Sequence, residues 1–210
     1  MVRKSYGEKK RRSGWRKPKR LLLISSEGNQ RNKTERQYFQ HFTSDRLTVR
    51  FVSGNETDPA SLMKQLIRSY KESELTSDDF AVCLTDGDFD ERRNEQLNAA
   101  EQLAKNFGRD NLRLIVSSPC FEIWLLCHFQ YSTHQYGNAG EVLCALSACL
   151  AKEYTKSMDV YVYVHGKEEI AIANAKRLEA YQLAQGRKKH SVAFSPSTEV
   201  YAIFEECIMK

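Results

Sequence analysis

Four short apolar segments, separated by stretches long enough for helices, constrain the fold of this 210-residue chain more than any other feature. Each segment has the length and the aliphatic content of a buried strand. The predicted strands are residues 19–26, 47–52, 80–85 and 112–116. Because a helix is predicted in each connection, parallel pairing with helices on both faces is the natural arrangement. The sequence therefore predicts an α/β fold with a mostly parallel, Rossmann-like sheet.

Helices are predicted between these strands and throughout the second half of the chain. Thr34 is a candidate helix cap, and Asp58 followed by Pro59 is typical of a helix start. After Pro119 the pattern becomes mainly helical, which predicts additional C-terminal helices. The predicted helices cover residues 34–41, 58–70, 91–107, 121–129, 139–153, 166–185 and 196–207. We expect residues 1–18 to be a basic tail and residues 19–210 to form a single domain.

Charge is distributed unevenly along the chain. The first 20 residues hold ten Lys or Arg against one Glu and carry +9, whereas the other 190 residues carry −4. A basic tail of this kind either contacts phosphates or remains a solvated arm without a specific partner. A second basic stretch lies in a predicted loop at residues 186–195. The candidates for nucleic-acid binding are Lys17, Lys19, Arg20, Arg187, Lys188 and Lys189.

Composition also narrows the class of protein. No apolar run of about 18 residues occurs, so no membrane partner is expected. The basic start is not followed by an apolar signal core, which argues against secretion. Six cysteines include no CxxC pair, so we expect reduced thiols in a cytoplasmic protein.

Acidic residues follow three of the predicted strands. The carboxyl ends of parallel strands meet at the edge where open α/β sheets place their sites. Carboxylates gathered there repel one another unless a cation joins them, and oxygen ligands suit Mg²⁺ or Mn²⁺. The candidate metal ligands are Glu27, Glu35, Asp86, Asp88, Asp90 and Glu122.

Ordinary structural roles remain open for several of these acids. Glu35 is also explained as a negative charge favoured at a helix N-terminus. Alternating Asp and Gly, as in residues 86–90, is also common loop chemistry. Glu122 stands in an otherwise apolar helix, so it must be paired, metal-bound or exposed to a cleft. His128 is expected to be a hydrogen-bonded core histidine rather than a ligand.

These segments together resemble the RloB-like family of bacterial, defence-associated proteins. The matching segments are residues 21–28 with Thr34, Glu35, Tyr38 and Phe39, then residues 86–88, residues 118–129, residues 175–178 and residues 195–198. The family is similar to Toprim domains, a group of metal-dependent nucleic-acid enzymes. The resemblance implies a Toprim-like fold and a nuclease in anti-phage defence, with Glu27, Asp86 and Asp88 as catalytic residues.

The resemblance also implies partners and an alternative role. An ATPase of the RloA type is an implied partner, and abortive infection is an implied setting. A lysine could neutralise charge on the reacting phosphate, and Lys156, Lys167 and Lys176 are the candidates. The alternative is a module that binds metal and nucleic acid without turnover and regulates a partner ATPase. A phospho-acceptor receiver is disfavoured, because one glutamate replaces the acidic pair expected after the first strand.

Overall fold

A five-stranded sheet forms the centre of the computed structural model, which describes residues 19–27 and 34–210. The strand order is β2-β1-β3-β4-β5, and the first four strands are parallel, as the sequence predicts. The strands are β1 (Arg20–Ser26), β2 (Leu47–Phe51), β3 (Phe80–Asp86), β4 (Leu112–Ser118) and β5 (Ser197–Thr198). The architecture is therefore α/β and Rossmann-like.

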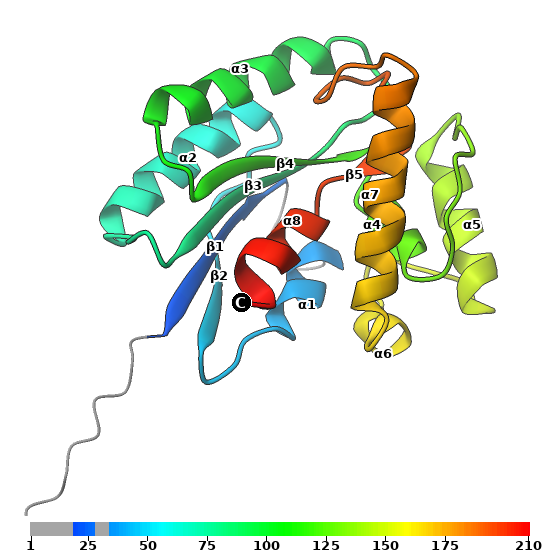
Figure 1. Ribbon diagram of the computed structural model, residues 1–210, viewed down its shortest axis with the longest axis horizontal. Coiled ribbons are helices and arrows are strands. Elements are labelled where there is room, and N and C mark those ends of the chain that lie inside the picture. Colours follow the sequence, from blue (N-terminus) through cyan, green and yellow to red (C-terminus); the bar gives the residue numbers. More distant parts are fainter. Residues whose placement is uncertain (1–18, 28–33) are drawn as a thin grey trace, which may run out of the picture.

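Helices cover both faces of the sheet (Figure 1). Helices α2 (Pro59–Glu72) and α3 (Arg93–Phe107) pack side by side on one face. On the other face lie α1, α4 and α8, with α7 packed on α4 and β5, and α5 packed on α4. Their bounds are α1 (Thr34–Gln40), α4 (Glu122–Cys127), α5 (Ala139–Leu150), α6 (Tyr161–Val164), α7 (Glu168–Ala184) and α8 (Tyr201–Ile203), followed by a π-helix at Phe204–Ile208.

Alternation along the strands divides the core into two layers. Leu22 and Ile24 point to the face where Trp124 and Phe204 are buried. Leu23, between them, points to the face covered by α2 and α3. Successive strand residues face opposite sides of a sheet, so helices on both faces explain why β1 and β3 are apolar throughout.

The predicted helix at residues 196–207 is wrong at its beginning. Ser197 and Thr198 instead pair antiparallel with the end of β4. The hydroxyl oxygens of Ser117 and Thr198 are 2.8 Å apart, and the Glu199 carboxylate accepts a hydrogen bond from the backbone N–H of Val116. These contacts with β4 hold the segment extended, so the helix begins only at Tyr201.

Two further properties concern the whole fold. Among residues 19–27 and 34–210, no helix is both long and apolar enough to cross a membrane. All six cysteines are free thiols.

His190 joins the 186–195 loop to Glu199, directly after β5, and to Glu101 of α3. These contacts predict a pH dependence of stability. Its Nε2 lies 2.9 Å from Glu199 Oε2, and its Nδ1 lies 3.5 Å from Glu101 Oε2. Burial alone would lower the pKa of His190, but the hydrogen bond and charge of Glu199, with those of Glu101, raise it above 6.5. Lys189 and Lys105 also contact these two glutamates.

Because its folded-state pKa is raised, charged His190 stabilises the fold fully below about pH 6.5. That contribution is lost as the pH rises through the folded-state pKa. We expect His190→Gln to lower the free energy of unfolding by about 1–2 kcal/mol at pH 6, and by less at pH 9. Urea unfolding at both pH values measures the difference. A loss that is equal at the two values would contradict this account.

Candidate metal centre

The carboxylates of Glu27 and Asp86 meet at the topological switch point of the sheet. The chain runs from β1 to β2 on one side and from β3 to β4 on the other, so it leaves the carboxyl ends of β1 and β3 in opposite directions. Glu27 directly follows β1, and Asp86 is the last residue of β3. Glu27 Oε1 accepts hydrogen bonds from the Thr85 hydroxyl and, at 3.3 Å, from the backbone N–H of Asp86. The two strand ends therefore bring their acids into one place.

A buried arginine joins these acids to the next one. The Arg93 side chain is only 7% exposed, and its guanidinium forms an ion pair with Glu27 Oε1. Its Nε lies 3.3 Å from Asp88 Oδ2 and donates to the carbonyl oxygen of Asp86 at 3.0 Å. Sequence reasoning missed Arg93. The available signal was a cation in the first turn of a helix, where the helix dipole disfavours it unless acids surround it.

Asp86 lies at the centre of the negative charge. It is partly buried, and its Oδ1 accepts a hydrogen bond of 2.9 Å from the backbone N–H of Phe121. Burial raises the pKa of Asp86 well above its usual range, and the charges of Glu35, Glu27 and Glu122 raise it further, whereas Lys156 opposes them. All three glutamates that the sequence singles out thus lie within electrostatic reach of Asp86.

Glu122 is buried, with 2% exposure, and is paired rather than isolated. Its Oε1 accepts a hydrogen bond of 3.2 Å from the Tyr154 hydroxyl and lies 3.8 Å from Lys156 Nζ. The Tyr154 hydroxyl oxygen also lies 2.7 Å from Thr34 Oγ1. The starts of α1 and α4 and the connection between α5 and α6 therefore converge here.

Lys156 is the candidate lysine that the structure brings to the acids. Burial alone would lower the pKa of Lys156, but the charges of Glu122 and Asp86 outweigh burial and raise it, so the ammonium stays protonated. Lys176 instead pairs with Glu205, and Lys167 lies over the Phe129 ring.

Asp86, Asp88 and Asp90 do not alternate along one extended strand, because β3 ends at Asp86. A side chain at Gly87 would place its Cβ 2.6 Å from Ser118 Oγ, so only glycine fits there. Asp88 then adopts a positive φ of 56° and donates its N–H to the Pro119 carbonyl. Asp90 is bound by Arg92, whose hydrogen bonds lower the pKa of Asp90 to about 2. In the described part of the chain, Arg92 holds the Asp90 carboxylate, which forms no hydrogen bond or ion pair with Glu27 or Asp86.

The other candidates from the sequence lie elsewhere. His128 is a core histidine, as expected: burial lowers its pKa to about 4, and its ring contacts Tyr38 and the Trp124 carbonyl. Lys19 and Arg20 lie at the amino end of β1, opposite Glu27, and Lys17 falls outside the described residues.

The basic side chains of the 186–195 loop contact other residues of this chain. Arg187 donates to Gln182 and to the Ser195 carbonyl. Lys188 donates to Asn98 Oδ1, and Lys189 pairs with Glu179. Any contact of these side chains with nucleic acid would have to compete with these partners.

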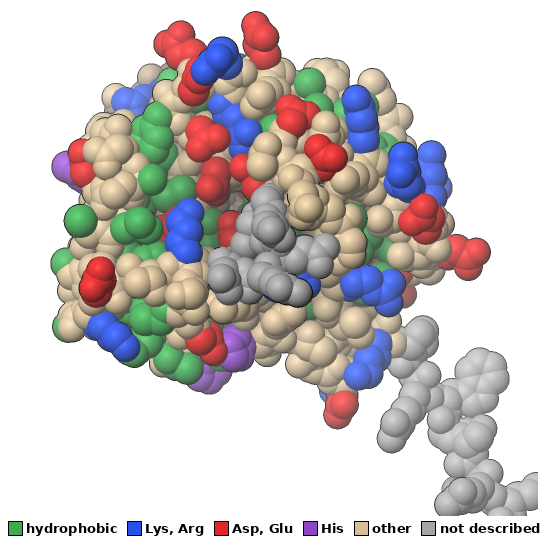
Figure 2. Space-filling view, turned by 180° about the vertical axis from the view of Figure 1, so that it is seen from behind, with side chains coloured by type: hydrophobic (Ala, Val, Ile, Leu, Met, Phe, Trp, Pro, Cys, Tyr) green, Lys and Arg blue, Asp and Glu red, His purple; other side chains and the backbone are tan. Residues whose placement is uncertain are grey.

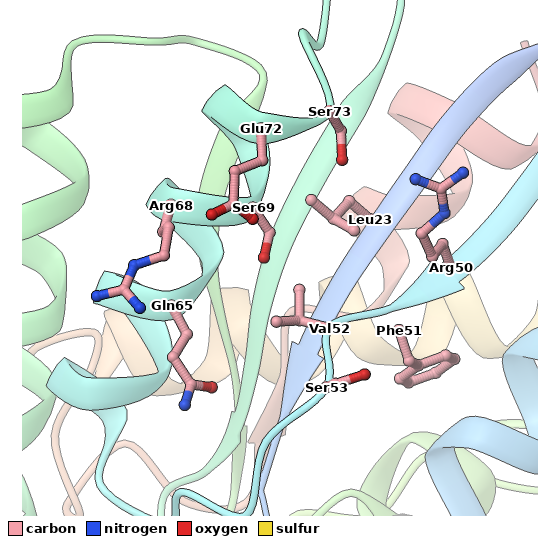
Figure 3. Close-up of a pocket in the computed structure, with 10 residues that line it drawn as sticks. All are labelled: Leu23, Arg50, Phe51, Val52, Ser53, Gln65, Arg68, Ser69, Glu72 and Ser73. Carbon is pink, nitrogen blue, oxygen red and sulfur yellow. The ribbon is translucent and has the colours of Figure 1, made fainter.

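A cavity of about 450 Å³ lies away from Glu27 and Asp86, between the edge strand β2 and α2 (Figure 3). Arg50 and Arg68 stand on opposite sides of it and do not point toward one another. On the face shown in Figure 2, by contrast, acidic side chains gather with basic ones among them.

The family model described as RloB-like protein matches residues 22–207 of this chain. The chain belongs to the RloB-like protein family. Neither the curated proteins nor the solved structures include a match to it. The matched range of this RloB-like protein contains every residue of the acidic site, from Glu27 through Lys156.

The donors of this RloB-like site are of the type that Mg²⁺ and Mn²⁺ bind, because they are carboxylate oxygens. Among residues 19–27 and 34–210, no three His, Cys, Asp or Glu side chains already stand close enough to share one ion. Arg93 instead neutralises Glu27 and Asp88. An ion at Asp86 would therefore require Glu27 or a neighbouring acid to turn toward it.

Proposed function

We propose that this RloB-like protein is a Mg²⁺- or Mn²⁺-dependent nuclease whose ion is held at Asp86. The observation that carries the proposal is the meeting of the Glu27 and Asp86 carboxylates at the ends of β1 and β3, where Glu27 Oε1 accepts the backbone N–H of Asp86. Burial raises the pKa of Asp86, and the charges of Glu35, Glu27 and Glu122 raise it further, so a bound cation would stabilise this carboxylate. The proposed ligands are Asp86 with Glu27, Glu35, Asp88 and Glu122. Asp90 is a weaker candidate, since Arg92 binds it. The resemblance to Toprim domains supports the same assignment.

The side chains of this site have separable roles in the proposed reaction. A bound divalent ion supplies the charge that polarises a phosphodiester and lowers the pKa of an attacking water. Glu27, whose Oε1 accepts the backbone N–H of Asp86, would ligate the ion or take a proton from that water. The Lys156 ammonium can neutralise charge that builds up on the phosphate oxygens. Arg93 positions Glu27 through its direct ion pair.

A cleavage assay tests the proposal directly. We expect the full chain to cut single-stranded DNA, duplex DNA or RNA in Mn²⁺ or Mg²⁺ and to lose all cutting in EDTA. Calorimetric titration with Mn²⁺ should show binding that the Asp86→Ala, Asp88→Ala double variant lacks. Cutting that is unchanged in this double variant would remove the proposed function.

One observation favours a second candidate, a module that binds metal and nucleic acid without turnover. Arg93 already compensates Glu27 and Asp88, so this site is stable without chemistry. In that case a partner ATPase of the RloA type would act on the bound nucleic acid. Salt-sensitive binding without cleavage would favour this function. The ATPase partner and a role in anti-phage defence are part of both proposals and are supported by the family resemblance.

A further inference from the structure

The loop between β3 and α3 exposes a phenylalanine. The Phe89 side chain is 41% exposed. All ten phenylalanines lie in the described part of the chain, and the other nine are buried or half-buried. Burial of an aromatic ring stabilises a protein, so the fold gains little from Phe89 where it stands. A single exposed apolar residue is common, so its surroundings must decide its role.

Phe89 lines a cavity that adjoins the acidic site. The cavity has a volume of about 510 Å³ and is also lined by Asp88, Asp90, Arg92, Arg93 and Gln96. The Arg93 guanidinium also pairs with Glu27, so this one side chain lines the cavity and contacts the acidic site. The volume falls within the range of about 300–1,000 Å³ that is usual for small-ligand sites. A group held in this cavity would therefore lie next to the proposed reaction centre.

The lining of the cavity suits an unpaired nucleotide. An exposed aromatic ring offers a face on which a nucleobase of any sequence can stack. The Arg92 side chain is 88% exposed, and among the described residues its guanidinium is held by Asp90 alone. Exposed ion pairs of this kind are weak, so a phosphate can compete for the guanidinium. A base inside a duplex is already stacked on its neighbours and cannot lie on Phe89.

We propose that Phe89 stacks on an unpaired nucleobase while Arg92 leaves Asp90 to bind the adjoining phosphate. This inference rests on the proposed nuclease function and adds its substrate class, which is single-stranded nucleic acid. It also supplies the base-stacking element that the sequence alone does not reveal.

Binding in EDTA tests this inference without any cleavage. Fluorescence anisotropy of labelled 12-nucleotide dT and U oligomers would compare wild type with Phe89→Ala. We expect the variant to bind about 5- to 150-fold more weakly, which is the usual effect of losing one stacked base. Arg92→Gln should flatten the dependence of log K on log salt by about one unit. A 12-base-pair duplex should bind more weakly than either single strand and should not distinguish Phe89→Ala from wild type.

Two further variants make the result decisive. Phe89→Trp should retain binding, and its added emission should be quenched by the single strand. Tyr163→Ala removes another exposed aromatic, on α6, and should bind like wild type. Equal single-strand affinity of Phe89→Ala and wild type would overturn the stacking role, even if cleavage in Mn²⁺ persists. If wild type binds single strands in a Phe89-dependent way but does not cleave them in Mn²⁺, the nuclease function alone would be overturned.

Discussion

Replacing Asp86 with asparagine is expected to reduce metal-dependent cleavage by at least about 100-fold, because the central charged ligand is lost. Asparagine keeps the oxygen that accepts the hydrogen bond from the Phe121 N–H, so the loop should keep its shape. Initial rates with a fluorescent oligonucleotide in Mn²⁺ measure the effect. Asp78→Asn, an exposed aspartate just before β3 at the other edge of the sheet, is the matched control and should keep full activity.

The same variant should make the metal-free protein more stable. The raised pKa of Asp86 means that the folded state holds this proton more tightly than the unfolded state. Wild type therefore loses stability as the pH rises through that pKa, whereas asparagine carries no charge at any pH. In EDTA at pH 8 we expect a gain of about 0.5–2 kcal/mol in the free energy of unfolding, and a smaller gain at pH 5. A variant that is inactive but less stable at pH 8 would indicate a structural role for Asp86.

Replacing Arg93 with alanine is expected to lower the free energy of unfolding by about 2–3 kcal/mol, because half-buried Glu27 would lose its cation. This is less than the loss for a fully buried pair, since Asp88 is exposed and water can solvate it. Arg93 also donates to Thr85 Oγ1 and to the carbonyl oxygen of Asp86, and those groups would lose their donor as well. Urea unfolding in EDTA measures the loss.

Arg92 supplies the matched control, since it is the adjacent arginine but is fully exposed. Arg92→Ala should leave the free energy of unfolding close to that of wild type. If the acids bind a divalent ion, about 10 mM Mg²⁺ should restore part of the stability of Arg93→Ala, because an ion that binds only the folded state stabilises it. Equal losses for the two arginines would show that the buried ion pair does not hold the site together.

Local patterns were sufficient to predict most of the sheet, since β1, β3 and β4 are short apolar runs between helix-length segments. The antiparallel strand β5 could not be predicted in this way. It has two residues, and it is extended because Thr198 and Glu199 contact β4, more than 80 positions earlier in the chain. The short helix α6 was missed for a related reason, because four residues carry no helical period.

The candidate site was predictable where a residue follows a strand directly. Glu27 and Asp86 are fixed by strand pairing, so their proximity follows from the parallel order of β1 and β3. Partners that come from helices and loops were not predictable, because their side-chain directions depend on the finished fold. Arg93 and Tyr154 are examples, and so are the cations of the 186–195 loop, which pair with neighbouring side chains.

The pairing of Glu122 with Tyr154 and Lys156 limits how this polypeptide can be shortened. A version that ended after α4 would still bury the carboxylate but would lack its hydroxyl and ammonium partners, which follow α5. An unmatched buried anion costs several kcal/mol, so such a fragment would not keep the sheet edge intact. The connection between α5 and α6 is therefore part of the acidic site rather than an appendage to it.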